Sequence, residues 1–138
     1  MTGLATAVLV LMAVAAVSSC RRASDNGKID GYWKIQEIYY IADGTTVYPE
    51  EEFIGIQLEL IQLMNPRPVG SSKVWLTGVV SYDKKSDFFS VDFRYNPSPE
   101  QLYPYGFSAP QEVLAIERAD SRYLVFTSAI ARVTCRKF

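Results

Sequence analysis

The sequence predicts an all-β protein: a small, eight-stranded antiparallel up-and-down barrel that follows an N-terminal signal segment. From residue 31 onward the chain is a succession of short runs, rich in β-branched and aromatic residues and separated by turn residues. The connections are mostly short and no long helical segment intervenes, which favours a meander of neighbouring antiparallel strands. About eight strands suffice for such a sheet to close and fill its interior with side chains. A two-sheet sandwich is the alternative architecture.

The chain begins with an apolar run over residues 4–17, followed directly by Ser18, Ser19 and Cys20. As a helix this run would be about 21 Å long, which is too short for the roughly 30 Å hydrocarbon core of a bilayer. Its length and the small residues after it are typical of a secretory signal and its cleavage site. An uncleaved anchor helix or a buried core helix is the alternative interpretation.

The cysteine that follows the small residues resembles the lipobox of bacterial lipoproteins. In those proteins the cysteine is acylated and becomes the first mature residue, so the resemblance implies that Cys20 anchors the protein to a membrane. We divide the chain into a lipoprotein signal peptide (residues 1–19), a polar, lipidated flexible tether (20–28) and a β-barrel (29–138). The expected location is the cell envelope, at the outer membrane and facing the periplasm.

The composition excludes several functions. The 14 basic and 15 acidic residues give a net charge of −1, and this near-neutral mixture argues against nucleic acid as a partner. The absence of histidine removes Ser-His and Cys-His nucleophilic pairs and imidazole metal ligands. No Gly-rich phosphate loop, paired-cysteine spacing or nucleophile elbow occurs. We therefore expect a monomer that is not an enzyme and has no catalytic residues, cofactor or metal.

The sequence contains two cysteines, Cys20 and Cys135. If Cys20 carries the lipid, no internal disulfide can form, although an oxidising compartment would permit one. Cys135 lies in an apolar strand and is expected to be a small buried hydrophobic residue rather than a reactive thiol.

The strand assignments follow from alternation of apolar and polar residues. The predicted strands cover residues 31–41, 45–48, 54–61, 73–82, 88–95, 112–118, 122–127 and 130–137. An Asp43-Gly44 pair marks the hairpin between the first two. The acidic run at 50–52 is interpreted as a solvated turn, with loose binding of a cation as the alternative. The run after it has the period of one half-buried strand, and its apolar face consists of Ile54, Ile56, Leu58 and Leu60.

A loop rich in Pro, Gly and Ser follows at residues 65–72. The next strand places Val74, Leu76 and Val80 on one face, and residues 83–87 form a charged hairpin tip.

The longest interruption of the strand pattern, residues 96–111, contains four of the seven prolines. Ser98 as N-cap and Pro99 at the first helical position predict one or two helical turns. Three short strands finish the chain, and the first two are joined by a turn at residues 119–121.

The first strand opens with Gly31-Tyr32-Trp33. This G-x-W spacing resembles the start of lipocalins, in which glycine lets the backbone turn into the barrel floor and tryptophan closes that end. The whole barrel region is similar to the compact lipocalin-like domains in lipoproteins of Bacteroides-type bacteria. The resemblance implies that an arginine of the last strand lies across the indole, and Arg132 and Arg136 are the positions for it.

A second family also resembles this chain. META-type domains of bacterial lipoproteins start with a similar strand, but they usually carry a Gly-Cys-Asn motif that does not occur here.

Two groups of aromatic residues are candidate contacts for a ligand or partner. The first group consists of Trp75, Phe89, Phe93 and Tyr95. These side chains either line a cavity for an apolar ligand or simply fill the barrel interior. The second lies on a Pro-Gly loop that is either a lid or partner patch at the barrel mouth or a plug folded into one end. It consists of Tyr103, Tyr105 and Phe107.

Two functions follow from these alternatives. In the first, the barrel mouth binds a small apolar ligand and Trp33 seals the other end. In the second, the domain is a protein-interaction or inhibitor module, or a structural component of the envelope, without a ligand cavity. An open apolar cavity of about 300 Å³ or more favours the first, and a packed interior beside exposed aromatic residues favours the second.

Overall fold

The computed structural model describes residues 26–65 and 74–138, so Cys20 and its leader lie outside the described part. Within it the chain forms nine strands and three short helical segments. The strands are β1 (Gly31–Tyr40), β2 (Thr45–Val47), β3 (Phe53–Gln57), β4 (Leu60–Asn65), β5 (Val74–Tyr82), β6 (Phe88–Phe93), β7 (Gln111–Ala119), β8 (Tyr123–Thr127) and β9 (Ala131–Lys137). The helical segments are η1 (Gly27–Ile29), α2 (Pro99–Leu102) and η2 (Tyr103–Tyr105).

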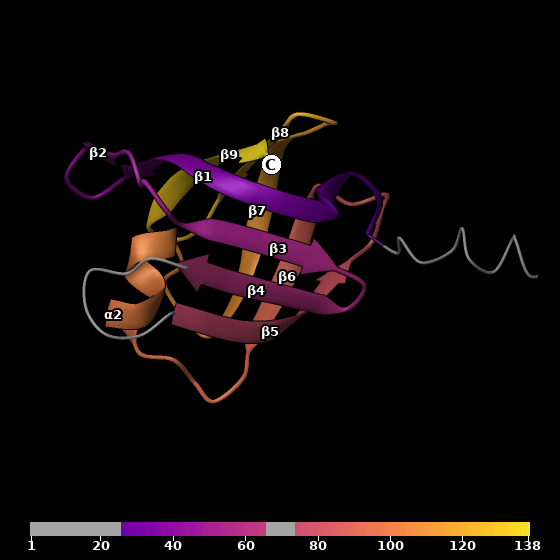
Figure 1. The fold of residues 1–138 in the computed structure, drawn as a ribbon, viewed down its shortest axis with the longest axis horizontal. Helices are drawn as coiled ribbons and strands as arrows, with labels where there is room; N and C mark the ends of the chain where they lie inside the picture. Colours follow the sequence, from indigo (N-terminus) through magenta and orange to yellow (C-terminus); the bar gives the residue numbers. More distant parts are fainter. Residues whose placement is uncertain (1–25, 66–73) are drawn as a thin grey trace, which may run out of the picture.

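The strands form one antiparallel sheet in the order β2-β1-β3-β4-β5-β6-β7-β8-β9, and β9 pairs back onto β1. Eight strands therefore close into a barrel, and β2 is an additional strand beside the second half of β1. In Figure 1, β1, β3, β4 and β5 cross the front of the barrel and β6 to β9 run behind them. The predicted up-and-down barrel is confirmed, and the sandwich alternative is wrong.

The predicted strand over residues 54–61 is wrong: these residues form the β3–β4 hairpin, with its turn at Leu58-Glu59. Ile56 pairs with Ile61 and both are buried, whereas Leu58 and Leu60 are exposed. The inward-facing residues therefore have even numbers before the turn and odd numbers after it. Because the turn carries leucine rather than glycine or asparagine, the sequence shows no break in the pattern.

The sixth strand ends earlier than predicted, at Phe93. Tyr95 lies beyond it with φ of +63° and its side chain is 100% exposed. The Arg94 N–H makes the last hydrogen bond to β5, to the Thr77 carbonyl, and no further pairing of β6 with β5 follows. The chain leaves the sheet at this point. Tyr95 therefore cannot line the interior.

Aromatic side chains fill the barrel. Edge-to-face contacts join Phe89 to Phe126 (ring centroids 5.6 Å apart) and Phe93 to Phe107 (5.3 Å). Such rings pack at the density of a protein interior, so they leave no room for a ligand where they touch. Cys135 is also fully buried, and burial raises the pKa of its thiol, as expected for a hydrophobic filler.

One end of the barrel, its floor, is closed by Trp33. This side chain is fully buried, and its Nε1 donates to the Ile29 carbonyl of η1 at 2.9 Å. Residues 26–28, predicted as tether, belong to this folded end, because Asn26 is buried and donates hydrogen bonds to Asp30. The rest of the tether predicted for 20–28 lies outside the described residues.

The cation over the Trp33 ring is Lys137, with its Nζ 4.7 Å from the ring centroid. The expectation for Arg132 and Arg136 is wrong. Alternation along β9 puts both arginines on the outer face, whereas Lys137 pairs directly with Trp33. Arg132 forms an ion pair with Glu117 on the surface.

The opposite end is plugged by the segment from α2 to the start of β7, at the left of Figure 1. The predicted helix is confirmed: Pro99 begins α2, and the N–H of Ser98 donates to Oε1 of Gln101 at 2.9 Å. After η2, Gly106 adopts φ of +84°, where a Cβ would lie 2.4 Å from Cγ2 of Val133. This turn directs the following residue, Phe107, into the core.

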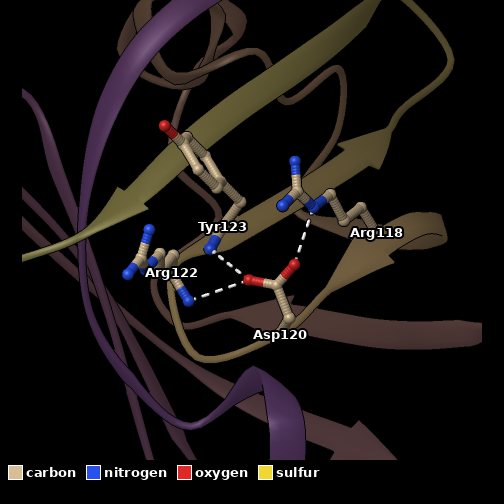
Figure 2. Close-up of polar contacts among 4 residues, drawn as sticks. All are labelled: Arg118, Asp120, Arg122 and Tyr123. Carbon is tan, nitrogen blue, oxygen red and sulfur yellow. Dashed lines mark hydrogen bonds and ion pairs between the residues drawn. The ribbon is translucent and has the colours of Figure 1, made fainter.

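The predicted turn at 119–121 joins β7 to β8 and is built around Asp120 (Figure 2). Its carboxylate accepts from the N–H groups of Arg122 and Tyr123, both at 2.8 Å, and from Arg118 Nε at 2.7 Å. These hydrogen bonds, led by the one from Arg122 N–H, lower the pKa of Asp120 to about 2.

No helix in the described ranges is long and apolar enough to cross a bilayer.

Candidate functional site

A hollow of about 500 Å³ opens at the end of the barrel away from η1. We call it the mouth hollow. Its walls come from the end of β1, the β1–β2 hairpin, the segment before β3, the last residue of β4, and η2. The lining residues are Tyr40, Asp43, Thr45, Val47, Pro49, Glu50, Glu51, Glu52, Asn65, Tyr103 and Pro104.

One wall of the mouth hollow is a pair of stacked tyrosine rings. The rings of Tyr40 and Tyr103 lie 4.4 Å apart at an interplanar angle of 12°, and the Tyr40 hydroxyl donates to the Tyr103 carbonyl at 2.7 Å. Tyr40 is buried and Tyr103 is 48% exposed. The buried ring and its hydrogen bond therefore hold an exposed aromatic face in place at the mouth.

The other wall is acidic. Asp43 and the run at 50–52 line the hollow, and the described residues that line it include no lysine or arginine. Glu52 is positioned by two hydrogen bonds at 3.1 Å, one from Asn65 Nδ2 and one from the Glu51 N–H.

The negative charge at the mouth affects neighbouring groups. The pKa of Tyr40 is raised to about 12, first by burial and then by the charges of Tyr103 and Glu52. Burial, and secondly Glu52, also raise the pKa of Tyr105. Asp43 stays ionised to lower pH, because the Thr45 N–H donates to its carboxylate and lowers its pKa.

Two polar contacts hold the plug beneath the mouth hollow. Ser128, in the β8–β9 turn, donates its hydroxyl to the Gly106 carbonyl at 2.5 Å. The carboxylate of Glu112 accepts from the Ser108 N–H at 2.8 Å and from the Ala129 N–H at 2.9 Å. These contacts fasten the plug to the start of β7 and to the β8–β9 turn. The plug thereby separates the mouth hollow from the apolar interior.

The structure separates the first group of aromatic residues that the sequence analysis proposed as ligand contacts. Phe89 and Phe93 are core residues, and Trp75 points outward and is 53% exposed. Trp75 pairs with Met64, and Met64 pairs with Phe53. Phe53 pairs in turn with Lys34 on the outer face of the barrel. Because residues that pair directly across antiparallel strands share a face, Trp75 also points outward and cannot line the interior.

The aromatic loop behaves mainly as a plug. Tyr105 and Phe107 are buried, as the plug alternative predicts, and Phe107 meets Phe93 inside the barrel. Tyr103 alone of the three is exposed, and it faces the mouth hollow.

Sequence reasoning missed Tyr40, Asp43 and Asn65 as site residues. It interpreted the run at 50–52 as a solvated turn, with loose binding of a cation as the alternative. The one available signal was the local density of acidic residues, which by itself does not distinguish a surface turn from a binding wall. The pairing of these residues with Tyr103 depends on contacts between distant parts of the chain.

The chemistry available at the mouth hollow is binding. Carboxylates beside an exposed aromatic ring favour a cationic group. Among the described residues, no group of three or more carboxylate, thiol or imidazole side chains is arranged to hold a metal ion.

Comparisons with known proteins agree with this architecture. A family model described as a lipocalin-like domain matches residues 14–138. A crystal structure of a lipocalin-like protein from Bacteroides uniformis is similar, with a TM-score of 0.67 and 19% identity, over 81% of this chain and 100% of that one. An uncharacterized protein from Bacteroides eggerthii has a TM-score of 0.61 and 15% identity, over 79% of this chain and 98% of that one. No curated protein matches.

The structural likenesses establish the fold, and the family model extends over most of the sequence. The closed antiparallel barrel is consistent with that match. This chain belongs to the lipocalin-like domain family.

Proposed function

We propose that the protein is a lipid-anchored recognition module of the cell envelope, which binds a basic segment of another protein at its mouth hollow. The observation that carries this proposal is the combination of a filled barrel with an acidic and aromatic hollow outside the plug. A carrier of apolar ligands needs an enclosed apolar cavity. Here the rings of Phe93, Phe107 and Phe126 occupy that space.

The anchoring part of the proposal is supported by the sequence. Cys20 follows a signal-like apolar run and two small residues, so we propose that it is acylated and holds the domain, as a monomer, at the periplasmic face of the outer membrane. We propose no catalytic activity for this site.

The chemistry of the partner follows from the two walls of the hollow. A lysine or arginine side chain can place its charge over the exposed Tyr103 ring, while its donors reach the carboxylates at 50–52. Val47 and Pro104 supply apolar surface at the edges for the aliphatic stem of such a residue.

Site-specific photo-crosslinking tests this proposal. The lipidated protein, with p-benzoylphenylalanine in place of Tyr103, is irradiated in host cells and its adducts are identified by mass spectrometry. The matched control carries the same amino acid in place of Phe88, which is 54% exposed on β6 outside the hollow. We expect a protein adduct at position 103 that is absent at position 88.

A second pair of variants tests the role of charge. Glu50→Gln combined with Glu51→Gln should weaken the adduct by roughly two- to fivefold for each carboxylate, as for an exposed ion pair. A yield that does not change, or an adduct equally strong at position 88, contradicts the proposal.

A small apolar ligand is the second candidate, and one observation favours it. The plug is a short segment on an apolar interior, held at its rim by the contacts of Ser128 and Glu112. Its release would open the barrel at the end that Trp33 does not seal. Native mass spectrometry of the protein from its host distinguishes the two candidates, because only this one predicts a co-purifying small molecule.

A further inference from the structure

We infer that the floor end of the barrel docks on the surface of an anionic bilayer. The docking surface, which we call the basal rim, consists of Lys28, Leu58, Lys84, Lys85, Arg122 and Phe138, all of them exposed. This inference rests on the proposed acylation of Cys20. It assigns to the protein an orientation on the membrane and a second contact in addition to the lipid.

Contacts between distant segments bring the basal rim together. Three methylene groups of Lys84 lie 3.6–3.8 Å from the place that a Cβ on Gly27 would occupy. Asn26 donates its side-chain amide to the carbonyl of Leu58.

The C-terminus joins the same end. The Lys137 N–H donates to the Arg122 carbonyl at 2.7 Å, and the Phe138 N–H donates to the Tyr32 carbonyl at 2.9 Å. Both ends of the described fold and three hairpin turns therefore share this rim, because the strands alternate in direction around the barrel.

Leu58 is the least expected residue of the basal rim. It occupies the tip of the two-residue β3–β4 turn with φ of +56°, a conformation that favours glycine or asparagine. Its side chain is 43% exposed. A large apolar residue in a left-handed conformation at an exposed tip is unfavourable for folding in water. It is favourable where the tip enters the interface of a bilayer.

The charges of the rim fit an anionic surface. These cations come from three segments: Lys28 from η1, Lys84 and Lys85 from the β5–β6 turn, and Arg122 from the β7–β8 turn. Of the neighbouring carboxylates, Asp120 is ion-paired with Arg118, so these two charges offset each other.

Four more carboxylates lie at this end, against the four cations of the rim and the adjacent Arg136 and Lys137, so this end carries a small excess of positive charge. Asp83 accepts from the Lys85 N–H at 3.0 Å, and Asp30 accepts from Asn26. Glu59 and Asp87 are the other carboxylates in the basal turns. The opposite end carries the acidic mouth hollow, so this charge distribution turns the basal rim toward anionic headgroups and the mouth hollow away from them.

The tether limits which end can reach the membrane. Between Cys20 and Asn26 the chain spans six residues. Fully extended, these cover about 20 Å. Because Asn26 is fixed to the floor by its hydrogen bonds, an acyl group on Cys20 keeps the basal rim within that distance of the bilayer. Aromatic and leucine side chains beside lysines suit this interface, where long cationic side chains reach the headgroups.

Hydrogen exchange on the lipidated protein tests the inference. The protein is reconstituted into vesicles of phosphatidylcholine alone or with about one-third phosphatidylglycerol, and its acyl mass is verified beforehand by intact mass spectrometry. We expect slower exchange of the amides in the turns at 57–60 and 83–87 on the anionic vesicles. The mouth segment at 48–52 should be unaffected.

Three variants decide the cause. Lys84→Gln with Lys85→Gln should lower the ratio of docked to undocked protein roughly 25-fold, at about fivefold per cation. Leu58→Asn should raise the melting temperature, because asparagine tolerates the left-handed turn, and yet weaken docking. Arg94→Gln, which removes one exposed cation beyond the mouth end of β6, is the matched control and should change nothing.

Equal exchange on both kinds of vesicle, protection at the mouth, or an equal effect of Arg94→Gln would overturn the inference. Absence of the acyl mass would instead contradict the proposed anchor, so the two failures are distinguishable.

Discussion

Lys137 lies over the indole ring of Trp33, and its Nζ also donates to the carbonyl of Asp30 at 2.7 Å. One side chain near the C-terminus thereby joins the last strand, the ring that closes the floor and the residue that precedes β1. Its position explains why the floor is closed without an arginine.

Replacing this cation should cost little but measurable stability. Lys137→Met retains the aliphatic stem but removes the cation–π contact and the hydrogen bond to Asp30, so we expect the free energy of unfolding in urea to fall by about 1–2 kcal/mol. The control is Arg136→Met on the outer face of β9, where the change should stay within about 0.5 kcal/mol. A larger effect for Arg136 would show that the outer residue stabilises the floor.

The plug depends on the backbone of Gly106. We expect Gly106→Ala to destabilise the fold by about 2–4 kcal/mol, because it adds a left-handed alanine and forces its Cβ against Val133. Gly44→Ala separates the two causes: Gly44 also has positive φ, but its Cβ would meet only the Tyr39 hydroxyl at 3.8 Å. Its cost should be about 1–2 kcal/mol. Chemical denaturation measures both, and equal losses would contradict the proposed close packing.

Ser128 fastens the plug to the β8–β9 turn. Ser128→Ala leaves the buried carbonyl of Gly106 without this donor, and the expected loss is about 1–3 kcal/mol. Hydrogen exchange should quicken at the Phe107 amide before the strands open, since the plug is the part released. The exposed Ser121→Ala is the control. Unchanged exchange at Phe107 would show that Glu112 alone holds the plug.

The β7–β8 turn should affect acid stability through Asp120 (Figure 2). Its pKa is lower in the fold than in the unfolded chain, so the ionised carboxylate stabilises the fold. This contribution is present above the ordinary pKa of 3.8 and is lost as pH falls through about 2. Asp120→Asn should therefore flatten the dependence of stability on pH in that range, as measured by urea unfolding. Glu100→Gln, on the exposed side of α2, provides the comparison.

Much of the fold is predictable because a period of two shows which face of a strand is buried. The alternation around Phe89, Val91 and Phe93 identified inward-facing positions that are all buried in the structure. Turn chemistry located the hairpin at Asp43-Gly44 and the short helix at Pro99. The same signals failed at Leu58, where the turn contains no turn-forming residue and two strands merged into one.

The sequence by itself determined the succession of strands that forms the barrel, and its resemblance to lipocalins predicted Trp33 at the floor. It left open whether the aromatic loop is a lid or a plug. Tertiary structure alone decided that Lys137 covers the indole, that Trp75 points outward and that Tyr103 meets the carboxylates of the mouth hollow. The physical reason is that alternation depends on neighbours along one strand. Register and closure depend instead on pairings between strands far apart in the chain, and a shift of one residue moves a side chain to the opposite face.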